Sequence, residues 1–349
     1  MKKRSICLIP EATSLGGPRT FQRNLIAWAE QSGQAEIHFD PDREDIDAFL
    51  VIGGPKKYLG RLLKARRKGI PVVHRLNGMN WIHHRRKTGV KYFLHAEAAN
   101  LAIAFYRRFV CSKIVYQSPF CEKRWDSVYG KLNKPAAVIF NGTDIRKFTP
   151  AAADPDLSAR IDFVLAEGSF RYGMDFGLDA GAELAVELAK RLDRPVCMHV
   201  AGKTNPDSEA RIRERLLTSG VSAEVRFEGV CSREKLIEME QKAAFFFSSE
   251  INAACPNAVI EALACGLPVI GFDTGALKDV TGDGGIIVPY GADPWKLEKP
   301  DCGGLIDAAE QVIRSNTAFR RAARARAEAE FPIEKMAEAY ISFCMGNVK

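Results

Sequence analysis

The sequence lacks the features that would place it at once in a disulfide-rich, zinc-binding or membrane-spanning class. Its nine cysteines include no Cys-x-x-Cys pair, which argues against a disulfide framework and a structural zinc site. Reduced thiols are typical of the cytoplasm, where we expect the protein to reside. The chain contains no uninterrupted apolar run of about 18 residues, so we expect no transmembrane helix. The apolar stretch at residues 6–10 is also too short for a signal peptide.

The composition and the patterning indicate an α/β protein of two domains. The 349 residues are 46% hydrophobic and 27% charged, with a net charge of +7, and a chain of this length is expected to form two domains. Short β-branched segments alternate with amphipathic ones in both halves, which predicts parallel sheets with helical crossovers. Residues 149–157, rich in Pro and Ala, predict a linker. We therefore expect Rossmann-like domains at 1–152 and 158–330, which bind ligands at their strand ends.

The segment 255–270 carries the clearest functional signal. Pro256 suits the first turn of a helix, where free N–H groups favour an anion such as a diphosphate. Asn257 and Glu261 lie one turn apart on the same helix face. A carboxylate at this place can accept hydrogen bonds from the vicinal hydroxyls of a ribose. The same spacing is also typical of an ordinary strand–helix–strand unit with a surface glutamate.

This segment resembles the sugar-nucleotide site of the retaining glycosyltransferases of family four, also called glycosyltransferase group 1. Five further segments are similar to family motifs in the same order: 16–17, 140–150, 200–202, 227–229 and 274–279. The resemblance implies a GT-B fold, in which two Rossmann-like domains face a cleft. It also implies that the last helix, within 331–349, crosses back to the N-terminal domain. Glu261 matches the family's second acid, which binds the ribose of the nucleotide sugar.

Three positions depart from the family pattern. Ala253 stands where the family has its first donor-site acid, and Asn77 stands where the family has a histidine near the transferred sugar. Glu250 and Asn252 offer substitutes for the acid at a different spacing. The family has an Arg and a Lys that hold the diphosphate, whereas the matching segment here has one cation, Arg171, at a displaced position. Lys203, from a neighbouring loop, is a second candidate for binding the diphosphate.

We expect a metal-independent reaction in which fixed donors meet the charge of the leaving nucleoside diphosphate. The expected catalytic residues are Gly17, Asn77 and Arg171, with Arg19 a weaker candidate. The expected donor-binding residues are Gly16, Lys203, Asn257, Glu261, Thr274 and Gly275. Asp-x-Asp triplets occur at 40–42, 45–47 and 154–156, but they fall in an acidic loop and in the linker. We therefore expect no metal and no cofactor other than the nucleotide-sugar substrate.

Basic residues gather in the N-terminal half, with Glu97 as the only acid between Arg61 and Arg108. They are Arg61, Lys64, Arg66, Arg67, Lys68, Arg75, Arg85, Arg86, Lys87, Lys91, Arg107 and Arg108. Together with Trp81 and Ile82, these charges favour peripheral contact with an anionic membrane at its inner face. A solvated basic face is the alternative. Nucleic acid is not expected, because no nucleic-acid-binding module accompanies the charge, and the adjacent pair His83 and His84 predicts no metal site.

The sequence thus predicts a hexosyltransferase-type enzyme of polysaccharide biosynthesis. It would move a sugar from a nucleoside diphosphate sugar to a lipid-linked or glycan acceptor. Ala253 and Asn77 keep open the alternative of a catalytically weak GT-B binding subunit. The 141–144 hinge signature speaks against a GT-B epimerase. A nicotinamide dehydrogenase is disfavoured because no Gly-x-Gly-x-x-Gly follows the first strand.

Overall fold

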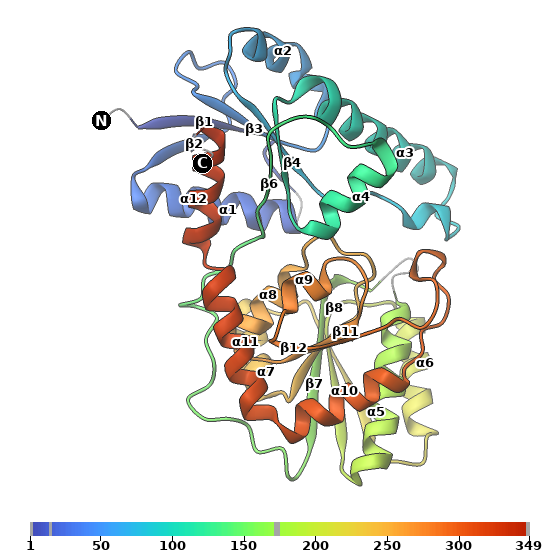
Figure 1. Ribbon diagram of the computed structural model, residues 1–349. Helices are drawn as coiled ribbons and strands as arrows, with labels where there is room; N and C mark the ends of the chain where they lie inside the picture. The colour runs from blue at the N-terminus through green and yellow to red at the C-terminus, as the bar shows by residue number, and fades with distance from the viewer. Residues whose placement is uncertain (1–2, 14–15, 171–174, 347–349) are drawn as a thin grey trace. The chain divides into compact units, whose positions relative to one another are not determined.

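The computed structural model describes residues 3–13, 16–170 and 175–346, which form two compact units (Figure 1). Unit 1 consists of Met1–Gly142 and Phe331–Lys349, and unit 2 consists of Thr143–Glu330. The chain thus leaves unit 1 at Gly142. This point precedes the predicted linker, and residues 149–157 lie within unit 2.

Unit 1 is built on a six-stranded sheet in the order β2-β1-β3-β4-β5-β6, in which every adjacent pair is parallel. The strands are β1 (Arg4–Ile9), β2 (Ala35–His38), β3 (Ala48–Ile52), β4 (Val72–Leu76), β5 (Lys113–Tyr116) and β6 (Ala136–Val138). The helical segments are α1 (Gly17–Ser32), η1 (Lys56–Tyr58), α2 (Leu59–Arg67), η2 (Ile82–His84), α3 (Val90–Phe105), the π-turn η3 (Tyr106–Val110), α4 (Pro119–Tyr129) and α12 (Ile333–Cys344).

Side-chain alternation along β1 divides the core of unit 1 between the two faces of its sheet. Ile6 and Leu8 pack in the cluster that includes α1 and α12. Cys7 and Ile9, which point the other way, pack in a second cluster with Leu62 of α2. Both faces are therefore apolar, as expected for a parallel sheet covered by helices on both sides.

The final helix, α12, packs in unit 1 although it follows unit 2 in the sequence (Figure 1). Phe21 of α1 and Tyr340 of α12 are both buried, with ring centroids 4.8 Å apart. Lys113 Nζ donates a hydrogen bond to Phe343 O at 2.8 Å. A Cβ on Gly142 would lie 3.0 Å from Ile333 Cα, so a side chain at this position would crowd the start of α12. The predicted crossing of the last helix to the N-terminal unit is confirmed.

Unit 2 has a second six-stranded sheet, in the order β12-β11-β10-β7-β8-β9, and its adjacent strands are also parallel. The strands are β7 (Ile161–Ser169), β8 (Val196–Lys203), β9 (Ala223–Gly229), β10 (Phe245–Ser248), β11 (Val269–Phe272) and β12 (Gly285–Val288). The helical segments are α5 (Phe176–Leu192), α6 (Pro206–Leu217), α7 (Arg233–Lys242), α8 (Asn257–Ala264), α9 (Leu277–Thr281), η4 (Pro294–Lys296), α10 (Gly303–Arg314) and α11 (Asn316–Glu330). Two parallel sheets with helical crossovers confirm the predicted α/β class.

Three features of the structure have little signal in the sequence. Strand β2 has only four residues, and two of them, Glu36 and His38, are polar. The Gly-rich stretch at 274–291 holds the short helix α9 and the strand β12. Helix α3 continues into a π-turn, where Cys111 N donates a hydrogen bond to Tyr106 O at 2.9 Å.

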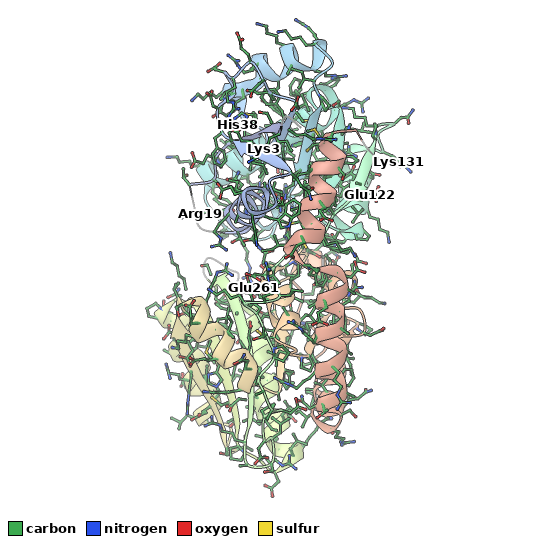
Figure 2. The ribbon with its side chains drawn as sticks, turned by 90° about the vertical axis from the view of Figure 1, so that its left-hand side faces the viewer. Lys3, Arg19, His38, Glu122, Lys131 and Glu261 are labelled. Carbon is green, nitrogen blue, oxygen red and sulfur yellow. The ribbon has the colours of Figure 1, made fainter. Side chains whose placement is uncertain are left out.

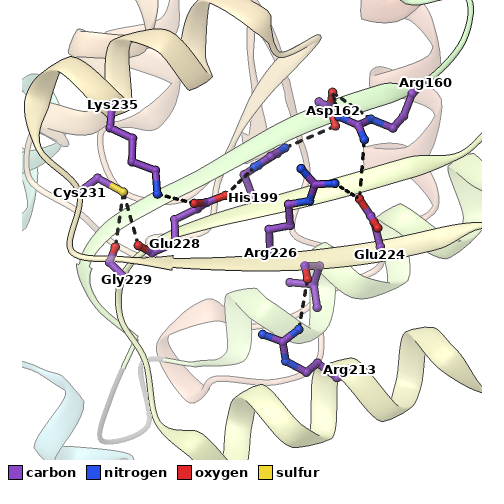
Figure 3. A network of polar contacts seen from close by, with 11 residues as sticks. Arg160, Asp162, His199, Arg213, Glu224, Arg226, Glu228, Gly229, Cys231 and Lys235 are labelled. Atoms are coloured by element: carbon purple, nitrogen blue, oxygen red, sulfur yellow. Dashed lines mark hydrogen bonds and ion pairs between the residues drawn. The ribbon is translucent and has the colours of Figure 1, made fainter.

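A charged network lies on the sheet of unit 2, with His199 of β8 between two carboxylates (Figure 3). Its Nδ1 is 3.0 Å from Glu228 Oε1, and its Nε2 is 3.4 Å from Asp162 Oδ1. Arg160 pairs with Asp162 at 3.0 Å, and Lys235 pairs with Glu228 at 2.6 Å. Burial of the ring opposes its charge, but the two carboxylates outweigh this effect and raise the pKa of His199.

We predict that the stabilisation contributed by His199 is complete below about pH 6.5 and is lost as the pH rises through the raised pKa. The reason is that the folded state binds this proton more tightly than the unfolded state does. His199→Asn should therefore be most destabilising at low pH, and the difference should shrink toward about pH 9 in urea unfolding. The exposed His95 provides the control, because His95→Asn should show no such trend. A constant difference across the pH range would contradict the prediction.

Candidate functional site

Helix α8 carries Glu261 one turn after its first residue, as the sequence predicts; Glu261 is labelled in Figure 2. Pro256 is the N-cap residue, and Asn257 begins the helix one turn before Glu261. The Glu261 side chain is mostly buried, and its Oε1 accepts a hydrogen bond from Arg233 Nη1 at 2.9 Å. Arg233 is the first residue of α7, so the ion pair joins the start of α7 to the middle of α8. This partner was not predicted, because the two residues are separated by 28 positions.

A second carboxyl group, that of Glu240, lies near the ion pair of Arg233 and Glu261 and was not predicted from the sequence. Glu240 is fully buried, and the Cys265 thiol is the hydrogen-bonding group beside its carboxyl. It lies two turns after Arg233, on the same face of α7. Burial and then the neighbouring Glu261 raise the pKa of Glu240 well above its ordinary value. Burial therefore favours the protonated, neutral form of Glu240. The spacing of seven residues on α7 is the signal that could have revealed it.

The loops after β10 and β11 pack tightly against each other around Ala253. Gly275 has φ +61°, and a Cβ there would lie 2.5 Å from Ala253 N, so no other residue fits. Ala276 N donates to Ala253 O at 2.9 Å, and the Oγ1 of the buried Thr274 lies 3.5 Å from Glu250 O. The structure thus brings Thr274 and Gly275 to the position of the missing acid. Asn252, a suggested substitute for that acid, is buried beside them with φ +59°.

The strand ends of β7, β8 and β10 carry the next group of predicted residues. Lys203 is exposed at the end of β8, and its carbonyl accepts a hydrogen bond from Phe170 N at 2.7 Å. Gly202 has φ +144°, and a Cβ there would lie 2.1 Å from Glu167 O. Ser249 donates its hydroxyl to Glu167. Burial and the neighbouring carboxyl of Glu250 raise the pKa of Glu167 well above its ordinary value.

The predicted cation Arg171 lies outside the residues that the structure describes. Of the two cations predicted to bind the diphosphate, Lys203 is the one that the structure describes. A cavity of about 380 Å³ is lined by Ser249, by the aromatic residues Phe247, Phe272 and Tyr290, and by charged residues that include Asp179 and Glu183. Neither Lys203 nor Glu261 lines this cavity.

In unit 1 the predicted residues follow the ends of β1 and β4. Gly16 has φ +138° and precedes α1, whose first residue is Gly17. Arg19 is exposed in the first turn of that helix (Figure 2). Asn77 directly follows β4 and is partly exposed. The described residues thus place backbone donors and one side-chain amide at the carboxyl edge of this sheet.

The basic surface of unit 1 is smaller than the sequence suggests. Arg75 and Arg107 are each only 1% exposed, so they do not belong to it. Arg61 forms an ion pair with Asp42. Arg85 and Arg86 are exposed next to α3. The sequence shows how many basic residues this segment has but does not show which of their side chains are buried.

Helix α3 adds an apolar stripe to this surface, which the sequence analysis did not identify. Val90, Leu94, Leu101 and Phe105 are exposed by 77%, 63%, 60% and 44%, and their spacing places them along one side of the helix. Tyr92, Phe93 and Phe109 are also exposed. None of the described helices is both long enough and apolar enough to cross a membrane. The stripe therefore lies on the surface of unit 1.

The adjacent histidines after β4 converge on one carboxylate. His83 Nε2 and His84 Nε2 lie 2.6 and 2.9 Å from Glu97 Oε1. His83 is buried and His84 is half-exposed. Asn100, one turn after Glu97 on α3, accepts a hydrogen bond from Asn80 N at 3.0 Å. The two histidines thus take part in the contact that holds the loop between β4 and α3 on α3.

Comparison with known proteins identifies the fold. Residues 175–299 match the family model described as "Glycosyl transferases group 1". A stretch of 91 residues is 33% identical to D-inositol 3-phosphate glycosyltransferase from Streptomyces bingchenggensis. This stretch covers 26% of this chain and 19% of that relative. The match thus spans about a fifth of the relative's length.

Solved structures match the chain over nearly its whole length. Sucrose-phosphate synthase from Thermosynechococcus elongatus is similar with a TM-score of 0.66 and 15% identity, covering 98% of each chain. Anabaena HepE, in complex with UDP and glucose, has a TM-score of 0.64 and 14% identity, covering 97% of this chain and 99% of HepE. The chain has the GT-B fold.

The family match falls on the part of the GT-B chain that contains the predicted donor residues. Lys203, Asn257, Glu261, Thr274 and Gly275 all lie within residues 175–299. Gly16, Gly17 and Asn77 lie outside it, in unit 1. The resemblance to glycosyltransferase group 1 is thus supported for the C-terminal unit, and the roles of individual residues remain predictions.

We predict that Glu240→Gln leaves the protein folded and reduces the loss of stability at high pH. A carboxyl group whose pKa is raised by folding stabilises the protein fully below its unfolded pKa of about 4.3 and less as the pH rises through the folded pKa. Glutamine has nearly the same shape and cannot ionise. Urea unfolding between about pH 5 and pH 9 should therefore give a flatter profile for the variant. The exposed Glu238 on the same helix provides the control, because Glu238→Gln should follow the parent. Parallel profiles for Glu240→Gln and the parent would show that Glu240 is ionised in the folded state.

Proposed function

We propose that this chain is a glycosyltransferase that moves a sugar from a nucleoside diphosphate sugar to a glycan or lipid-linked acceptor. We also propose that the transfer needs no metal ion and retains the anomeric configuration. The observation that carries the proposal is the family match over residues 175–299, which includes the helix of Glu261. HepE, which has the same fold, holds UDP and glucose, and this supports a nucleotide sugar as the donor.

The geometry of α8 supports a ribose-binding role for Glu261. Its carboxylate is fixed by Arg233, and the N-terminus of α8 supplies backbone N–H groups that favour a phosphate. Lys203 at the end of β8 provides a cation for the diphosphate, and Thr274 and Gly275 provide further backbone groups. Developing charge on the leaving group would then be stabilised by donors already in place, which is electrostatic catalysis.

The surroundings of the Asp-x-Asp triplets support transfer without a metal ion. Asp47 Oδ2 accepts a hydrogen bond from Ser5 N at 2.8 Å, and Asp45 pairs with Arg43 at 2.8 Å. Asp42 pairs with Arg61, and Asp156 Oδ1 accepts a hydrogen bond from Ser158 N at 2.9 Å. These carboxylates take part in local structure, which leaves the charge of the diphosphate to cations and backbone donors.

A binding subunit without turnover is the second candidate, and Ala253 favours it. The methyl group of alanine cannot hold the hydroxyls of a donor sugar, and the close approach of Gly275 to Ala253 fills the space around that backbone. Such a protein would bind the nucleotide through Glu261 and leave the sugar loosely held. Binding and hydrolysis measured on the same preparation distinguish the two candidates.

We predict that one class of nucleoside diphosphate raises the melting temperature of the protein, because a ligand that binds the native state stabilises it. Glu261→Ala should weaken that binding about tenfold or more, since it removes a charged acceptor of hydrogen bonds. Glu238→Ala, an exposed change on α7, should leave it unaltered. Hydrolysis of the matching nucleotide sugar then supports the enzyme, and binding without hydrolysis supports the binding subunit. The proposal fails if no nucleoside diphosphate or nucleotide sugar binds.

We further propose that unit 1 contacts an anionic membrane through α3 and the bases beside it. The exposed stripe of Val90, Leu94, Leu101 and Phe105 provides the apolar contact. Arg85, Arg86, Lys87 and Lys91 are exposed around its N-terminal end. Apolar side chains flanked by Lys and Arg are typical of helices that lie in the membrane interface. This location would suit a lipid-linked acceptor.

We predict that the protein sediments with anionic vesicles of phosphatidylglycerol at low salt but not with neutral vesicles of phosphatidylcholine. The double variant Arg85→Ala, Arg86→Ala should lose about 2 kcal/mol of binding, or roughly thirtyfold in partitioning. Leu94→Asp should weaken binding as well. Leu217 is 85% exposed on α6 of unit 2, so Leu217→Asp is the matched control and should bind like the parent. Failure of the parent to sediment with anionic vesicles at low salt would refute membrane contact.

A further inference from the structure

Unit 1 buries two arginines whose partners differ. Arg107 donates to the carboxylate of Asp126 and to Tyr116 Oη, so its charge is compensated. Arg75, also 1% exposed, has no carboxylate among its hydrogen-bond partners in the described chain. Buried charges are normally paired. An uncompensated arginine at the end of β4 is therefore an unusual feature that calls for a role.

The guanidinium of Arg75 is held by amide oxygens from three loops. Its Nη1 donates to Asn77 Oδ1 at 2.6 Å, and its Nη2 donates to Gln117 Oε1 at 2.9 Å and to Asn141 Oδ1 at 2.8 Å. The ring of Phe21 lies below it, with 4.1 Å between the guanidinium carbon and the ring centroid. These neutral partners orient Arg75 but do not cancel its charge.

The chemistry of arginine fixes the orientation of these amides. A guanidinium has only donors, so each amide that faces it must present its oxygen. Gln117 Nε2 then donates to Leu76 O at 2.8 Å and to Asn77 Oδ1 at 3.0 Å. Asn77 Oδ1 thus accepts two hydrogen bonds, one from Arg75 and one from Gln117. Both of its lone pairs are used inside the cluster.

The nitrogen of the Asn77 side-chain amide, Nδ2, points away from these hydrogen bonds to Oδ1. Trp125 Nε1 donates to Asn77 O at 2.9 Å, which fixes the backbone of this residue. Among the described residues, no hydrogen bond is formed by Asn77 Nδ2, and the residue is partly exposed. The two N–H bonds of this group are therefore free to donate to a ligand. The buried charge behind them polarises the amide and strengthens such a bond.

We propose that Asn77 Nδ2, oriented and polarised by Arg75, binds a phosphate group of a ligand at the carboxyl edge of unit 1. A phosphate oxygen is a strong acceptor, and its negative charge is attracted by the uncompensated guanidinium. Asn77 touches the ligand, whereas Arg75 is a positioning residue. The inference goes beyond the proposed function, because it concerns a phosphate site that a nucleoside diphosphate or a phosphorylated acceptor could occupy.

Asn77→Asp tests the proposal, because it keeps the shape and reverses the chemistry. The new carboxylate would pair with Arg75, neutralise its charge and replace the donor with an acceptor. We expect the melting temperature to stay the same or rise, while affinity for a phosphate ligand falls about tenfold or more. A purely structural role for Asn77 predicts unchanged phosphate affinity instead. Asn80→Asp puts the same charge into the same loop at an exposed position and should leave the affinity nearly unchanged.

Titration calorimetry with UDP and with glucose 6-phosphate separates the two sources of phosphate. If Asn77→Asp loses affinity for UDP, the site belongs to the diphosphate. If it loses affinity for glucose 6-phosphate alone, the site belongs to a phosphorylated acceptor. Glucose 6-phosphate binding through Asn77 without any UDP binding would support this site while refuting the proposed donor. Arg75→Gln should lower the affinity for the same ligand, although Asn77 itself is unchanged in this variant. The proposal is overturned if the parent binds neither ligand, if Asn77→Asp binds like the parent, or if Asn80→Asp weakens binding equally.

Discussion

Parallel strand pairing is the constraint on which the chemistry of both units depends. Parallel neighbours must be joined by crossovers, so the loops that leave the carboxyl ends of the strands gather at one edge of each sheet. In unit 1 this brings the loops after β4, β5 and β6 to a single guanidinium, although Asn77 and Gln117 are 40 residues apart. In unit 2 it brings Ser249, after β10, to Glu167 of β7. The polar clusters are therefore products of topology, because no local sequence motif contains them.

Burial then decides which of these polar groups keeps its charge. A buried carboxyl group can bind a proton, and burial together with the neighbouring Glu261 raises the pKa of Glu240 well above its ordinary value. Arginine cannot give up its proton in a protein. Burial thus favours the neutral form of Glu240 in unit 2, whereas the guanidinium of Arg75 in unit 1 keeps its charge. This difference supports the phosphate site that we propose beside the buried arginine.

The sequence was sufficient for the alternation of strands and helices, because β-branched runs and helical periodicity are local signals. It also located α8 and the position of Glu261 on it. It could not reveal that Arg233 pairs with Glu261, or that His83 and His84 meet Glu97, because these contacts depend on how neighbouring helices and loops pack. The basic stretch shows the same limit: its charges were visible, but the burial of Arg75 follows from partners on three other segments.

Two of the departures from the family pattern, Asn77 and Ala253, have different chemical weight. The family's histidine and the Asn77 found here can both donate an N–H bond, and Arg75 ensures that Asn77 presents its donor outward. This substitution therefore conserves the kind of hydrogen bond offered at the end of β4. Ala253 is different, because a methyl group cannot replace a carboxylate that accepts hydrogen bonds from sugar hydroxyls. A Cβ on Gly275 would clash with the backbone of Ala253, so the facing loop must keep a glycine beside it. In the enzyme that we propose, recognition of the donor sugar, rather than of its phosphates, is thus the step that differs most from the family the chain resembles.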